Sequence, residues 1–269
     1  MYYNHPVNVD IAGTVESIAK ITPESLYKCY NTFYNPSNMA LCISGNFNID
    51  EVMNLIEKTV KNNNKKVEFE NIFPKEPLNV VNKRVVQEFE ISSPMFELGF
   101  KEDPKDKRAS TTELAYTSII LEAIASKSSK LYKKLLDEKL INTSSFSYEY
   151  FEGPGYRSII FSGESVDPDK TAQIIKNYID EIHKNGISEE DFCFAKKSLY
   201  GKIIELFDSI DDISNLMVNF SFANRDIFEY IDVISNADIK SLHERLKDEL
   251  ITSNSSLSIV KPIAKEKSK

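Results

Sequence analysis

The chain of 269 residues is acidic: 41 Asp and Glu residues against 33 Lys and Arg residues give a net charge of −8. This charge argues against a nucleic-acid partner, because phosphates attract basic surfaces. No apolar run approaches the roughly 20 residues of a membrane span, and the first residues carry no secretory signal pattern. With 41% hydrophobic and 28% charged residues, the composition is typical of a globular protein.

The first 62 residues predict a helix–strand–helix segment. Thr22 precedes Pro23 as an N-cap, and apolar residues then recur at three- and four-residue spacing up to Tyr34. An Asn-Pro-Ser-Asn turn leads into a short apolar run that we expect to be a buried strand. The predicted elements are helices over 13–20 and 22–34, a strand over 39–44, and a helix from about 48 to 61.

A polar, Asn-rich stretch with two prolines predicts a linker over residues 63–82. The part that follows predicts strands in hairpins with helices grouped between them, which indicates an α+β fold with a largely antiparallel sheet. The predicted strands are 84–91, 95–100, 145–151, 156–163 and 257–260, the first two joined through Ser92-Ser-Pro. The predicted helices are 109–139, 167–184, 188–208, 211–222 and 236–250.

A repeat relates the beginning of the chain to its end. The segment from Thr22 to Ile43 recurs without a gap as Asp238 to Ile259 (238 − 22 = 216), with Ser, Leu, Asn and Ile at matching positions. Each copy reads as a helix, a short Asn/Ser turn and a strand. Such self-similarity indicates two copies of one structural unit. Since the first copy begins so early, we expect the first unit to be incomplete.

The residues that could carry catalysis are few. His5, His183 and His243 are far apart in sequence, and none has a second imidazole one helical turn away, as a zinc helix requires. Asp208, Asp211 and Asp212 lack the glycine and terminal glutamate of a calcium loop, so helix capping is the simpler interpretation. The sequence therefore predicts no catalytic residue and no metal ligand.

Tyr148 and Tyr150 are the candidates for substrate binding, because they belong to an aromatic hairpin with Phe151 and Tyr156. Such strands line peptide grooves in some proteins, although packing within the sheet is the commoner role. Cys29, Cys42 and Cys193 are odd in number and lack CxxC spacing, which predicts reduced thiols and a cytoplasmic location.

Several phrases in fixed order resemble the insulinase-like (pitrilysin) zinc metallopeptidase family, closest to its bacterial cytoplasmic branch. They are Asn4-His-Pro, Gly13-Thr-Val-Glu-Ser-Ile, Phe33-Tyr-Asn-Pro-Ser-Asn-Met, Ser44-Gly-Asn-Phe and Ser129-Lys-Leu-Tyr. The resemblance covers nearly the whole chain. It implies paired α+β domains, each a two-layer sandwich of antiparallel sheet and helices, that enclose a chamber for a peptide substrate.

The same resemblance implies where chemistry would occur. In that family an HxxEH motif and a distal glutamate hold zinc, and all of them precede the region that matches His5-Pro6. Active members also supply an Arg and, seven positions later, a Tyr; the aligned positions here are Leu136 and Thr143. We therefore expect this chain to lack the zinc ligands and the catalytic glutamate, and to be inactive alone.

These observations predict the end of a first peptidase-like domain over 1–62, a linker over 63–82 and a second such domain over 83–269. The predicted function is half of a peptide-binding chamber, completed by a missing N-terminal half or a homologous partner chain. No cofactor is expected in this chain, although zinc is expected in a complete active member. The alternatives are a non-catalytic partner or scaffold subunit, and an unrelated binding module. Exposed apolar residues around Met39 to Ile43 would also permit self-association.

Overall fold

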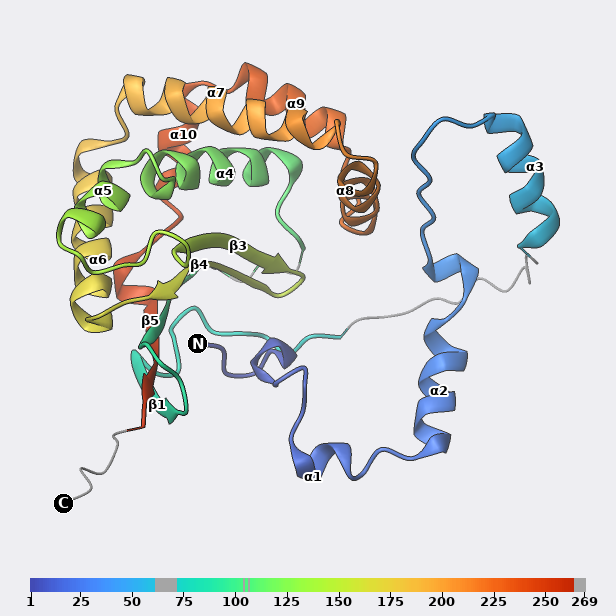
Figure 1. Cartoon of the computed structure of the whole chain (residues 1–269), viewed down its shortest axis with the longest axis horizontal. Coiled ribbons are helices and arrows are strands. Elements are labelled where there is room, and N and C mark those ends of the chain that lie inside the picture. The colour runs from blue at the N-terminus through green and yellow to red at the C-terminus, as the bar shows by residue number, and fades with distance from the viewer. Residues whose placement is uncertain (61–71, 104, 106, 264–269) are drawn as a thin grey trace. The chain divides into compact units, whose positions relative to one another are not determined.

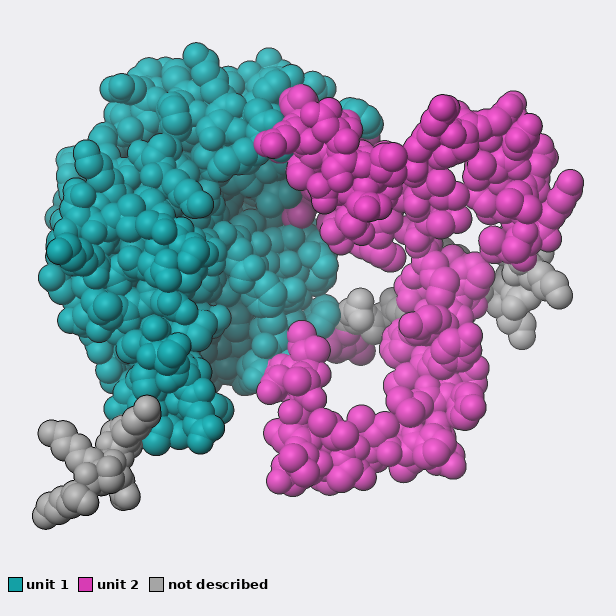
Figure 2. All heavy atoms as spheres, in the orientation of Figure 1, with its two compact units in different colours: residues 1–8, 73–202, 228–269 teal, residues 9–72, 203–227 magenta. Residues whose placement is uncertain are grey.

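The computed structural model describes residues 1–60, 72–103, 105 and 107–263. The chain divides into two compact units, which Figure 2 distinguishes by colour. Unit 1 comprises residues 1–8, 73–202 and 228–269, and unit 2 comprises residues 9–72 and 203–227. Among the described residues, no helix is long and apolar enough to cross a membrane.

Unit 1 is built on a five-stranded sheet with the strand order β1-β5-β2-β4-β3. Only the β1–β5 pair is parallel; the three other pairs are antiparallel. The strands are β1 (Arg84–Phe89), β2 (Met95–Lys101), β3 (Ser147–Gly153), β4 (Tyr156–Glu164) and β5 (Ser255–Pro262). The β3–β4 hairpin is confirmed, and its register pairs Tyr148 with Phe161 and Tyr150 with Ile159.

Helices α4 and α10 lie over one face of this sheet (Figure 1). The alternating side chains Leu98, Phe100, Ile159 and Phe161 point to that face and are fully buried. This arrangement is a two-layer α+β sandwich, as the sequence predicts. The helices α4 to α10 are Thr111–Ala125, Lys130–Asp137, Pro168–Asn185, Glu189–Leu206, Ile210–Phe222, Ile227–Asn236 and Ile239–Leu246.

The opposite face of the sheet carries the first residues of the chain instead of a helix, within the part that the structure describes. The Tyr2 hydroxyl donates to Ser158 Oγ at 3.2 Å, and a Cβ at Gly99 would lie 2.0 Å from the Met1 methyl carbon. Glycine at position 99 thus allows Met1 to lie directly on the sheet. This face is called the open face below.

Unit 2 contains short helices that bury none of their side chains completely. Its elements are α1 (Val15–Ile18), α2 (Pro23–Phe33), α3 (Ile49–Thr59), α8 and a 3₁₀ turn over Pro36–Asn38. Thr14, Thr22 and Asn48 cap the three N-terminal helices through their side chains. The local signals in this part of the sequence are therefore sufficient to form helices, but not a buried core.

The helix and the turn of the predicted repeat are present in both copies. Thr22 and Asp238 are both N-caps, and both accept a hydrogen bond from the backbone N–H three residues later. The 3₁₀ turns Pro36–Asn38 and Thr252–Asn254 also stand at matching positions (252 − 36 = 216). The two copies then differ, because the second continues as β5 and the first does not form a strand.

The prediction of a buried strand over 39–44 is wrong. Met39, Leu41 and Ile43 are 51%, 68% and 45% exposed, and no ladder includes them. A strand is held by hydrogen bonds to neighbouring strands, and the described residues offer this segment no such partner. Its side chains are exposed, as expected for an apolar segment without a covering layer.

Three further predictions need correction. The predicted helix over 109–139 is broken between α4 and α5, because Ser126 and Ser129 cap rather than continue a helix. Helix α9 was not predicted. Strands β1 and β2 are not neighbours, since β5 lies between them.

The predicted domain boundaries at 62 and 82 stay a prediction. Residues 63–71 of the predicted linker lie outside the described residues. Residues 73–82 belong to unit 1, where Glu76 and Val80 are buried.

Candidate functional site

The two candidate tyrosines point to the helical side of the sheet. The Tyr148 hydroxyl donates to Glu122 Oε2 of α4 at 2.8 Å. The Tyr150 hydroxyl donates to Glu102 at 3.3 Å and accepts from Arg245 at 3.1 Å. Burial is the main cause that raises the pKa of both phenols, so both stay neutral donors. The structure places both hydroxyls in the helix–sheet layer, and their role in substrate binding stays a prediction.

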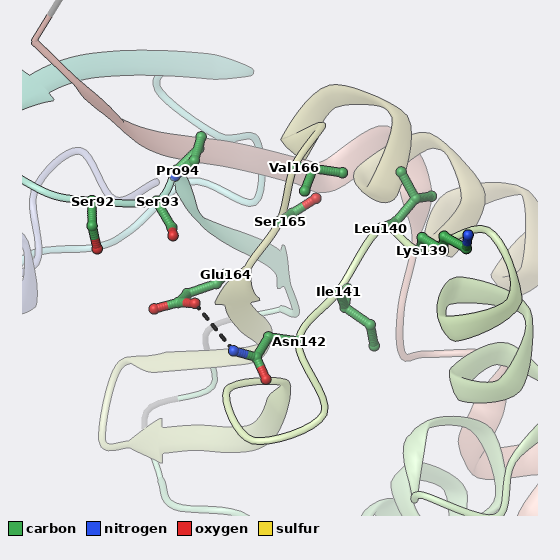
Figure 3. A pocket seen from close by; sticks show the side chains of 10 residues that line it. All are labelled: Ser92, Ser93, Pro94, Lys139, Leu140, Ile141, Asn142, Glu164, Ser165 and Val166. Atoms are coloured by element: carbon green, nitrogen blue, oxygen red, sulfur yellow. Dashed lines mark hydrogen bonds between the residues drawn. The ribbon is translucent and has the colours of Figure 1, made fainter.

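A pocket of about 290 Å³ lies at the end of β4 (Figure 3). It is bounded by the loop before β2 and by the segment after α5, which joins the sheet through a bridge between Ile141 and Ser165. Asn142 donates to Glu164 at 3.4 Å across its mouth. The lining residues are Ser92, Ser93, Pro94, Lys139, Leu140, Ile141, Asn142, Glu164, Ser165 and Val166.

A second hollow of about 330 Å³ lies on the open face and shares Glu164 with the first. Cross-strand partners Glu97 and Ser162 form its floor, and Met95 and Val260 give it an apolar part. The two hollows together form a surface with hydroxyl, carboxylate and aliphatic groups. Such a surface can contact an extended polypeptide.

The family resemblance predicts that Leu136 and Thr143 match its substrate-binding Arg and Tyr. These two residues flank the first pocket in sequence. Leu136 is half-buried near the end of α5, and Thr143 is exposed two residues after the bridge at Ile141. The Thr143 carbonyl accepts a hydrogen bond from the Tyr132 hydroxyl at 3.3 Å. Neither side chain supplies a guanidinium or a phenol.

The residues described do not fit a zinc ion. No group of three or more His, Cys, Asp or Glu side chains within the described ranges could hold a metal. His5 is buried, with Nε2 donating to the Pro154 carbonyl and Nδ1 accepting from the Val7 N–H. The Nε2 atoms of His183 and His243 contact backbone groups of Glu249 and Ile187.

Unit 1 contains buried charges that sequence reasoning missed. Lys101 and Glu76 form an ion pair at 2.6 Å with side chains that are 0% and 1% exposed. Glu76 also accepts from the backbone N–H groups of Tyr3, Asn4 and His5 at 2.7 to 2.9 Å. Although burial opposes ionisation, these hydrogen bonds lower the pKa of Glu76 to about 2. The pair therefore fastens the first residues of the chain to the sheet.

A second buried network joins Glu102, Arg245 and Glu249 between the sheet and α10. Charged residues at these positions carry no local pattern that separates them from surface residues. The available signal is the strand context, since Lys101 ends β2 after the buried run Leu98 to Phe100, and Glu102 follows directly.

The chain was compared with known proteins. The Peptidase M16 inactive domain matches residues 20–199. The uncharacterized zinc protease YmfH of Bacillus subtilis is 28% identical over 264 residues, covering 93% of this chain and 59% of YmfH. The structure of an M16-like peptidase from Alicyclobacillus acidocaldarius is 30% identical, with a TM-score of 0.89, over 98% of this chain and 63% of that one.

A Peptidase M16 inactive domain from Pseudomonas fluorescens has the same fold, with a TM-score of 0.81 at 14% identity, over 99% of this chain and 64% of that one. The chain thus spans about three-fifths of the length of these relatives. Since the family match covers more than half of the chain, the protein belongs to the M16 (insulinase-like, pitrilysin) zinc metallopeptidase family, in the part that contains its inactive domain.

Proposed function

We propose that this chain forms half of the peptide-binding chamber of an M16 zinc peptidase and is inactive alone. The observation that carries the proposal is the match of residues 20–199 to the inactive domain, in relatives that are longer than this chain. Zinc and its ligands would come from the part of the relatives that this chain does not cover.

In this proposal, the chain's own residues bind and orient the peptide. The open-face hollow offers the Ser162 hydroxyl and the Glu97 and Glu164 carboxylates to a backbone or side chain. Leu136 and Thr143 replace the Arg and Tyr that the family resemblance leads us to expect. We therefore propose that substrate is held here without that charged contact. Three free cysteines are consistent with a reducing, cytoplasmic location, which cell fractionation would test.

Reconstitution tests the proposal. We expect the purified chain to hold far less than one zinc per molecule by elemental mass spectrometry, and to leave a quenched fluorescent peptide uncut. Mixing it with the zinc-binding portion of its full-length protein should give hydrolysis that a chelator stops. Hydrolysis or stoichiometric zinc in the chain alone would overturn the proposal.

The second candidate is a non-catalytic partner or scaffold subunit. The neutral residues at Leu136 and Thr143 favour it, because they remove the family's substrate-binding pair from this half. The same mixing experiment separates the two candidates. A scaffold subunit would form a stable complex with its partner, but single substitutions in the hollow, such as Glu97→Gln, would leave peptide hydrolysis unchanged.

A further inference from the structure

Two buried carboxyl groups in unit 1 share one guanidinium. Arg245 Nη2 lies 2.6 Å from Glu249 Oε1 and 3.0 Å from Glu102 Oε2. The Glu249 side chain is 0% exposed, and those of Arg245 and Glu102 are 9% and 5% exposed. Both carboxyl groups keep one oxygen without a hydrogen-bond partner in the described part of the chain. If both were ionised, this cluster would carry an uncompensated negative charge away from water, which is costly.

The charged side chains next to this cluster form ion pairs with Glu113. On β4, Arg157 pairs with Glu113 of α4 at 3.1 Å, and Lys105 approaches the same carboxylate at 3.0 Å from a half-exposed position. Arg245 also lies 3.9 Å from Glu113. From β3, Tyr150 offers a neutral hydroxyl, and from α6, His183 contacts only the Glu249 backbone carbonyl. Among the described residues, the cation within 4.0 Å of Glu102 and Glu249 is Arg245, which the two carboxyl groups share.

Thr117 has one hydroxyl proton and two acceptors within reach. Its Oγ1 lies 2.8 Å from the Glu113 carbonyl, which can only accept, and it is also within hydrogen-bonding distance of Glu249 Oε1. Arg245 Nε donates to the same Oγ1 at 3.2 Å. Since the hydroxyl proton serves one acceptor at a time, both contacts are hydrogen bonds together only when Glu249 carries a proton.

We propose that the Glu102–Arg245–Glu249 cluster is a proton-operated lock within unit 1. With one proton held by the carboxyl pair, on Glu249, the cluster is neutral and fastens α10 to α4 and to the end of β2. When that proton leaves, a buried negative charge remains, and the attachment of α10 to α4 and β2 becomes weaker. Glu249 lies between α10 and β5 in the chain, and β5 joins β1 to the rest of the sheet. Weaker attachment of α10 therefore destabilises the sheet of unit 1.

The electrostatics agree with this geometry. Burial raises the pKa of Glu249 to about 8, against the opposing effect of Arg245, and burial also raises the pKa of Glu102. The two groups titrate as a pair, so the folded protein holds one proton that the unfolded chain releases. A group with a raised pKa in the folded state stabilises the fold fully at low pH. That contribution is lost as the pH rises from about 4.5 to about 8.

The test compares the full native chain with the variant Glu249→Gln, whose side chain at position 249 is neutral at every pH. We expect the melting temperature of the native chain to fall relative to that of the variant by about 3–5 °C per pH unit between pH 5.5 and 8. The native chain should also show an infrared band of a protonated carboxyl group that vanishes through this range and is missing in Glu249→Gln. Glu244→Gln, an exposed change on α10, should leave both readouts as in the native chain.

Equal pH slopes in the native chain and Glu249→Gln, or no titrating carboxyl band, would overturn the proposal. If Glu249→Gln does not fold, Glu102→Gln decides the question. It leaves Glu249 alone with Arg245, so the carboxyl band should titrate at a lower pH than in the native chain. A band that titrates at an unchanged pH in Glu102→Gln would overturn the proposal equally.

Discussion

Two buried glutamates of this chain have opposite pKa shifts. Glu76 and Glu249 are both fully enclosed, yet the pKa of the first is lowered and that of the second is raised. Glu76 has its own cation, Lys101, and three backbone donors, whereas Glu249 shares one guanidinium with another carboxyl group. The number of compensating donors, and not burial alone, sets the direction of the shift.

Replacing Glu76 with Gln should lower the free energy of unfolding by about 3–5 kcal/mol at pH 7, because Lys101 would remain as a buried, unpaired charge. The folded-state pKa of Glu76 is about 2, so its contribution is present above pH 4.5 and is lost as the pH falls towards 2. The difference between Glu76→Gln and the native chain should therefore shrink across that range in urea unfolding experiments. The exposed Glu90→Gln serves as the control, and a Glu76→Gln effect as small as this control's would refute the expectation.

At the scale of elements, capping decides where helices begin and end. A continuous apolar pattern predicts one helix over 109–139, but the short Ser-rich segment from Ser126 to Ser129 separates α4 from α5. Ser129 is buried and accepts from the Tyr132 N–H at 3.1 Å, which satisfies a donor at the start of α5.

Ser129→Ala should therefore lower the free energy of unfolding by about 1 kcal/mol, because that buried donor loses its acceptor. Thermal unfolding followed by circular dichroism would measure the loss. Ser129→Thr keeps a hydroxyl acceptor and should retain most of the stability. If Ala and Thr behaved alike, the side-chain cap would not be the cause.

At the scale of the whole molecule, the two units differ in how they bury apolar surface. Unit 1 encloses a core between its sheet and helices, whereas unit 2 leaves Leu26, Leu41, Leu55 and many aromatic residues exposed. A large exposed apolar surface marks a contact with another polypeptide. In the proposed function, that polypeptide is the remaining portion of the peptidase.

We expect the isolated chain to bind an apolar fluorescent dye and to associate with itself at high concentration. Leu41→Lys should reduce both effects, because it places a charge in the exposed apolar segment of unit 2. Val166→Lys, at an exposed position in unit 1, provides the control. Analytical ultracentrifugation would show the association, and a monomer without dye binding would contradict the expectation.

The sequence by itself determined the family, the α+β class, the cap at Thr22 and the β3–β4 hairpin, because these depend on local patterns and on recognisable phrases. It marked Tyr148 and Tyr150 but could not identify their carboxylate partners, which come from distant segments. Only the tertiary structure decided that residues 39–44 stay outside a sheet while their repeat forms β5. A strand depends on partners for its hydrogen bonds, and β5 has one on each side.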